Sequence, residues 1–151
     1  MADMKDEKFS EFLTSDDTLR VYKNEQLLFS SSKERLLPLV DYIDTCAPYE
    51  SDVTVFDRVV GNAAALLLTR ISCHEVYSEL GSELAAGTLN QFGIRYRFVE
   101  MVPYIENNRR DGMCPMEELS LDKTQDEFYE ALLARISGNP GMGGNDGPED
   151  C

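Results

Sequence analysis

The chain has 151 residues and a formal net charge of −14, from 28 acidic and 14 basic side chains. That length allows one domain with its own core, and 42% hydrophobic residues are ordinary for a globular protein. A surface this acidic repels phosphate backbones, so the composition argues against a nucleic-acid partner. The longest apolar run, 63–68, is too short to span a bilayer, and residues 1–17 contain no apolar signal segment. We therefore expect a cytoplasmic protein without a membrane partner.

The cysteines and the single histidine argue against a zinc site. Cys46, Cys73, Cys114 and Cys151 show no C-x-x-C spacing, and His74 is the one histidine. Free thiols in a reducing compartment explain this pattern, and we expect neither a metal nor a cofactor.

The N-terminal third predicts a hairpin followed by a helix. Residues 1–17 are acidic and weakly periodic, which is typical of an N-terminal extension. Two apolar runs, 19–22 and 27–29, flank a polar turn at Asn24 and predict an antiparallel hairpin. A capping-box pattern at 31–34 precedes apolar residues at helical spacing, and Pro38 marks either the first turn of that helix or a kink.

The central block, 53–102, reads strand, helix, strand, helix, strand. Short β-branched and aromatic runs alternate with helical stretches that follow Gly61 and Gly81. Helical crossovers of this length join parallel strands, and they bring both helix starts to one edge of the sheet. That edge is where open α/β sheets bind ligands.

The two helix starts, Gly61-Asn62 and Gly81-Ser82, are the first candidate site. Their free N–H groups and helix dipoles favour a polar or anionic ligand, although glycine can also be needed only for the turns. Three charged side chains belong to the same edge, namely Asp57, Arg58 and Glu83.

The segment 103–117 is the second candidate, because it is rich in proline, charged residues and sulfur. It either folds over the sheet edge and brings Asn107 and Cys114 to the site, or it only carries the chain onward. Cys114 is a weak candidate for catalysis, since nearby arginines favour a thiolate but a partner base is missing. The alternative is that it packs with Met113 and Met116.

The last elements are a helix over 126–136 and a glycine-rich acidic tail over 137–151, which we expect to be disordered. The predicted organisation is thus an extension (1–17), a single α/β domain (18–136) and a tail.

Several segments together resemble an uncharacterised prokaryotic family of unknown function, whose fold is similar to that of cytidine deaminase. The resemblance covers about 19–121, and its most specific part is Gly112-Met113-Cys114-Pro115-Met116-Glu117. It implies a three-layer α/β/α sandwich with strand order 2-1-3-4-5, an N-terminal antiparallel hairpin and parallel strands 3, 4 and 5.

The resemblance does not bring a zinc-dependent deaminase reaction with it. Zinc deaminases place His or Cys and a Glu at one helix start, and P-C-x-x-C at the next. Here those positions read Gly61-Asn62-Ala63-Ala64 and Gly81-Ser82-Glu83-Leu84. No catalytic residue is assigned beyond the weak candidate Cys114, and whether the chain is an enzyme stays open.

The leading hypothesis is a metal-free, deaminase-like domain that binds a small polar or nucleotide-like ligand. The residues expected to line the site are Asp57, Arg58, Gly61, Asn62, Ser82, Glu83, Asn107 and Cys114. The alternative is a non-enzymatic regulatory or protein-interaction module, and a homo-oligomer is compatible with either.

Overall fold

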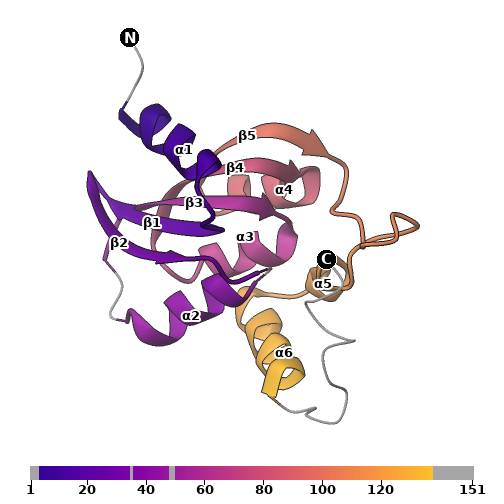
Figure 1. The fold of residues 1–151 in the computed structure, drawn as a ribbon. Coiled ribbons are helices and arrows are strands. Elements are labelled where there is room, and N and C mark those ends of the chain that lie inside the picture. Colours follow the sequence, from indigo (N-terminus) through magenta and orange to yellow (C-terminus); the bar gives the residue numbers. More distant parts are fainter. Residues whose placement is uncertain (1–3, 35, 48–49, 138–151) are drawn as a thin grey trace.

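A mixed five-stranded sheet forms the centre of the computed structural model, which describes residues 4–34, 36–47 and 50–137 (Figure 1). The strands are β1 (Leu19–Lys23), β2 (Gln26–Ser31), β3 (Val53–Val60), β4 (Cys73–Ser82) and β5 (Arg95–Val102). Their order is β2-β1-β3-β4-β5. β1 is antiparallel to β2 and β3, whereas β3, β4 and β5 are parallel. The predicted strand order, hairpin and parallel block are confirmed.

Helices cover both faces of this sheet and complete three layers (Figure 1). The helices are α1 (Met4–Thr14), α2 (Leu37–Thr45), α3 (Asn62–Leu68), α4 (Glu83–Gln91), α5 (Pro115–Ser120) and α6 (Gln125–Ser137). α1 lies on one face, and α2, α3 and α4 lie on the other. Every residue of α3 is buried, as expected for a helix of alanine and leucine with no outward polar face. None of the helices within the described ranges is long and apolar enough to cross a membrane.

The N-terminal segment is more closely associated with the sheet than its sequence pattern indicated. Phe9 and Phe12 of α1 are buried, and they pack against the rings of Tyr22, Phe56 and Tyr77. Two aromatic side chains three residues apart are a weak periodic signal, but each of them removes a large apolar area from water.

Other local differences concern helix starts. The capping box at 31–34 does not form, because the Ser31 hydroxyl accepts from the Lys33 N–H (3.1 Å) and Leu36 is the N-cap. Pro38 lies in the first turn of α2, so of the two alternatives, a first-turn proline or a kink, the first is confirmed. Asn24 adopts the left-handed conformation (φ 55°) that the tight hairpin turn requires.

The segment after β5 is not a plain loop. Glu106 and Met113 form an antiparallel bridge, and the chain then enters α5 at Pro115, a helix that the sequence reading missed. From residue 138 onward, the predicted tail lies outside the described residues.

Candidate functional site

A cavity of about 710 Å³ lies at the carboxyl ends of the parallel strands. Its walls come from the ends of β3, β4 and β5, the start of α3, the segment after β5, α5, and the residues just before β1 and α2. The lining residues that matter below are Glu34, Asp57, Arg58, Gly61, Glu100, Ile105, Glu106, Asn107, Arg110, Cys114, Met116 and Glu117. The edge of the sheet at which the sequence placed the site therefore carries a cavity.

Glu117 of α5 holds the start of α3 in place. Its side chain is only 1% exposed, and Oε1 accepts from the Asn62 N–H (2.5 Å) while Oε2 accepts from the Ile105 N–H (2.9 Å). Gly61 makes this approach possible, because a Cβ there would lie 2.7 Å from Glu117 Oε1 and 2.8 Å from Ile105 Cγ1. One buried carboxylate thus joins α3, α5 and the segment after β5.

The Asn62 side chain lies away from the cavity. Its Nδ2 donates to Ser120 Oγ (3.0 Å), and its Oδ1 accepts from the Thr88 hydroxyl. Both bonds fix α3 against α5 and α4. The structure therefore gives Asn62, which the sequence reading placed among the ligand contacts, a role in helix packing.

Asp57 is the titratable group that stands out in the cavity. It lies near the end of β3 and is 7% exposed. Burial raises the pKa of its carboxyl to about 7, although hydrogen bonds from the N–H groups of Val59 and Arg58 act in the opposite direction. At neutral pH this carboxyl exists in both protonation states.

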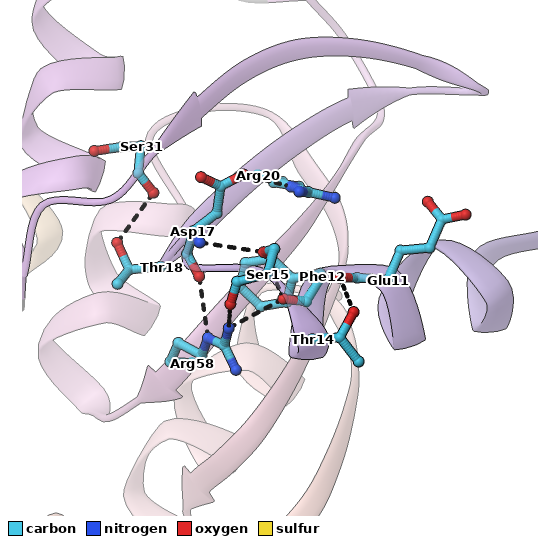
Figure 2. A network of polar contacts seen from close by, with 9 residues as sticks. All are labelled: Glu11, Phe12, Thr14, Ser15, Asp17, Thr18, Arg20, Ser31 and Arg58. Atoms are coloured by element: carbon cyan, nitrogen blue, oxygen red, sulfur yellow. Dashed lines mark hydrogen bonds and ion pairs between the residues drawn. The ribbon is translucent and has the colours of Figure 1, made fainter.

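Arg58 lines the cavity, but its guanidinium group is directed to the end of α1 and the turn that follows it (Figure 2). It donates to four main-chain carbonyl oxygens and lies 4.8 Å from the centre of the Phe12 ring. Those oxygens belong to Phe12 (3.0 Å from Nη2), Leu13 (3.2 Å from Nη1), Ser15 (2.6 Å from Nη2) and Asp17 (3.1 Å from Nε). Nη1 also lies 3.5 Å from Glu79 Oε1.

The start of α4 does not take part in this cavity. The buried Ser82 hydroxyl accepts from the Ala85 N–H (3.0 Å) and caps the helix, and Glu83 is exposed. A Cβ at Gly81 would lie 2.2 Å from the Phe98 ring, so this glycine makes room for an aromatic side chain. Neither Ser82 nor Glu83 lines the cavity.

The segment after β5 does close one side of the cavity, as one of the two readings expected. Asn107, Arg110 and Cys114 of this segment line it. Cys114 is buried, and its N–H donates to the Ile105 carbonyl (2.8 Å). Its sulfur is disulfide-bonded, whereas Cys46 and Cys73 are free, so the expectation of free thiols does not hold at Cys114. In this state Cys114 presents no thiolate to the cavity.

Sequence reasoning missed Glu117, Ile105 and the acidic residues Glu34, Glu100 and Glu106. A proline followed two residues later by Glu117 is a helix-start signal, and it could have identified α5. Nothing local to Glu117 shows that it caps a helix 55 positions earlier in the chain.

The residues at the two helix starts do not fit a zinc ion. Asn62 offers an amide that is bonded to Ser120 and Thr88, and Ser82 offers a hydroxyl that caps α4. Neither supplies the thiolate, imidazole or carboxylate that binds zinc in proteins. Within the described parts of the chain, no three His, Cys, Asp or Glu side chains are grouped so that they could hold a metal ion.

Comparison with solved structures shows the same fold in another protein. A crystal structure of a DUF1893 family protein from Thermotoga maritima matches with a TM-score of 0.77 and 22% identity, over 89% of this chain and 92% of that one. The dCMP deaminase of the cyanophage S-TIM5, in apo form, matches with a TM-score of 0.43 and 14% identity, over 61% of this chain and 89% of that one. No curated protein matches the chain.

The family itself is shown by the sequence. The model of the TM1506 domain of unknown function, DUF1893, matches residues 8–135, which include most of α1 and all five strands. The chain therefore belongs to the DUF1893 family.

Proposed function

We propose that the chain binds a small polar ligand in the cavity at the start of α3, with Asp57 as its principal polar contact. The volume of about 710 Å³ is within the range typical of small-molecule sites. The position at the carboxyl ends of parallel strands is the usual ligand position in open α/β sheets.

The observation that carries this proposal is a buried, titratable carboxyl on the wall of a cavity. The pKa of Asp57 is raised to about 7, so near neutral pH the group can accept or donate a hydrogen bond. A ligand that donates an N–H or O–H to Asp57 would favour the ionised form. The same property suits proton transfer, but binding is what the geometry supports best.

The ligand we propose differs from an anion bound at a helix start. Glu117 accepts the Asn62 N–H, so a protein carboxylate already occupies the position that a phosphate would take at α3. Of the polar or nucleotide-like ligands that the sequence suggested, those without a phosphate group are therefore favoured.

A thermal-shift screen tests the proposal. The panel contains nucleobases, nucleosides, their phosphates and small amines, and it is run on wild type, Asp57→Asn and Glu130→Gln. Glu130 is an exposed residue of α6, so Glu130→Gln makes the same acid-to-amide change away from the cavity. A ligand of the folded state raises the midpoint of unfolding, and the rise should occur in wild type and Glu130→Gln but not in Asp57→Asn. An equal rise in Asp57→Asn would refute the assignment of Asp57.

One observation favours a protein-interaction module as the second candidate. Among the described strands, β5 has a neighbour on one side only, and Val99 and Met101 on it are 68% and 46% exposed. Edge strands with apolar side chains can pair with a strand from another protein. Under this candidate, Val99→Lys should abolish the recovery of a specific protein in pull-downs while leaving every thermal shift unchanged.

A further inference from the structure

We propose that the ligand of this cavity is an organic cation, such as an amine or a guanidine. The inference rests on the proposed function, because it names the chemical class of the ligand at the same site. It follows from which charges line the cavity and which of them the protein already uses.

Carboxyl groups outnumber cationic groups on the cavity wall. Two arginines are among its lining residues, Arg58 and Arg110. The carboxyl groups are five, those of Glu34, Asp57, Glu100, Glu106 and Glu117. An acidic concavity with low-dielectric walls concentrates cations and repels anions.

The Arg58 guanidinium is already engaged by other groups of the protein. An arginine has five N–H donors, one on Nε and two on each Nη nitrogen. Here Nε has one acceptor, Nη2 has two carbonyl acceptors, and Nη1 has one carbonyl and the Glu79 carboxylate. Four of the donors therefore meet main-chain oxygens at the end of α1 and in the turn after it, and the fifth faces the Glu79 carboxylate of β4 as an ion pair. Figure 2 shows the bonds to Phe12, Ser15 and Asp17.

The positive end of the α3 helix dipole is not available to a ligand in the cavity either. Glu117 accepts the Asn62 N–H at 2.5 Å and places its own negative charge beside the helix start. Arg110 is the other cation, and it lies on the exposed turn of the segment after β5, on the same segment as Glu106.

Asp57 is thus a buried acidic group on the inner wall of the cavity. Among the described residues that line this wall, no cationic side chain is left over to pair with it. Burial of a carboxylate is costly unless a positive partner or hydrogen-bond donors compensate for it. A cationic ligand would supply that partner, and it would lower the pKa of Asp57 on binding. Binding should therefore release a proton near pH 7.

Isothermal titration with three four-carbon compounds tests the sign of the charge. The compounds are 1,4-diaminobutane, 1,4-butanediol and succinate, which share a backbone but are cationic, neutral and anionic. Titrations at low ionic strength should show saturable binding of the diamine and none of succinate. Because asparagine keeps an acceptor oxygen but not the negative charge, Asp57→Asn should weaken diamine binding by about tenfold or more.

Two further variants separate the cavity from general attraction to an acidic chain. Glu106→Gln changes an exposed residue of the cavity wall and should weaken diamine binding a few-fold even if Asp57→Asn folds poorly. Glu130→Gln removes the same charge from α6 and should bind as wild type does. Equal binding by all variants would mean attraction to the surface only, and the proposal would fall.

The remaining outcomes distinguish this inference from the function on which it rests. Tighter binding of succinate than of the diamine, or equal binding of butanediol and the diamine, would refute the proposal that the ligand is a cation. The proposal that the cavity binds a ligand would still stand. If none of the three compounds binds while an uncharged ligand stabilises wild type in the thermal-shift screen, the proposal of a cationic ligand is also refuted. If nothing binds in either experiment, both proposals are wrong.

Discussion

The two crossover helices begin with similar sequences but are held in different ways. α4 begins after Gly81-Ser82, and the Ser82 hydroxyl caps it locally by accepting from Ala85. α3 begins at Gly61-Asn62, and Glu117, far along the chain, caps it through the Asn62 N–H. A local cap leaves the surroundings of a helix start undetermined, whereas a long-range cap brings a second segment to it. The cavity lies at the second kind of start.

The glycines at the two helix starts differ in the same way. Gly81 makes room for the Phe98 ring, a contact between neighbouring strands of the sheet. Gly61 makes room for Glu117 and Ile105, which belong to the segment that closes the cavity. The same residue type thus supports packing at one helix start and assembly of the site at the other.

Removal of the long-range cap should have the largest effect. Glu117→Ala should lower the free energy of unfolding by about 3 to 4 kcal/mol, because two buried N–H groups lose their acceptor and a void remains. Glu117→Gln keeps one acceptor oxygen and should cost less. Urea denaturation measures both, with Glu118→Gln, at the exposed neighbouring position, as the control. A Glu117→Ala protein as stable as the control would contradict the role assigned to this carboxylate.

The next effect is a pH dependence that comes from Asp57. The folded-state pKa of about 7 lies above the ordinary value of 3.8, so between these values the folded chain binds more protons than the unfolded chain. The contribution of this group to stability is therefore fully present below about pH 4 and is lost as pH rises through 7. From about pH 5 to pH 8, wild type should lose on the order of 2 to 3 kcal/mol relative to Asp57→Asn.

Thermal or urea unfolding at several pH values measures that difference, and Glu130→Gln shows how much of it follows from net charge alone. Parallel stability curves for wild type and Asp57→Asn would mean that the pKa of Asp57 is not raised.

A pair of glycine substitutions compares the two helices directly. Gly61→Ala should destabilise by about 2 kcal/mol, since its Cβ would collide with Glu117 and Ile105. Gly87 lies within α4, and a Cβ there meets no atom of the described residues within 4 Å. Gly87→Ala should therefore stabilise by about 0.5 to 1 kcal/mol through helix propensity. A lower denaturant midpoint for Gly61→Ala and a higher one for Gly87→Ala would support the close contact assigned to Gly61. Destabilisation by both substitutions would count against it.

Loss of the local cap should have the smallest effect. Ser82→Ala removes one side-chain acceptor from the start of α4 and should cost about 1 kcal/mol. Ligand-induced thermal shifts should be unchanged, because Ser82 does not line the cavity. A loss of those shifts in Ser82→Ala would show that the start of α4 belongs to the site after all.

The sequence predicted what depends on neighbours along the chain. The alternation of strand-like and helical stretches, together with the glycine positions, indicated β3, α3, β4, α4 and β5. The order of the strands in the sheet was implied by the resemblance to the family. Ser82 could be recognised as a cap, because its partner is three residues away. Asp57 and Gly61 could be placed at the cavity from topology alone.

What the sequence could not predict is side-chain partnership across the fold. Asn62 resembles a ligand contact until Ser120 and Thr88 are seen to use its amide. Arg58 resembles an anion-binding group until its acceptors in the turn after α1 are counted. Each of these pairings depends on tertiary positions 26 or more residues apart, for which local periodicity carries no information.

The way in which Arg58 is held has a consequence for how this site tolerates mutation. Its four hydrogen-bond acceptors are main-chain oxygens, which every amino acid provides, so substitutions at Leu13, Ser15 or Asp17 leave those acceptors in place. Position 58 has no such freedom. A lysine has three donors at a single nitrogen and cannot reach acceptors that are spread around a planar fork. Side chains at 13, 15 and 17 can therefore change while the Arg58 guanidinium stays bound outside the cavity, provided that position 58 remains arginine.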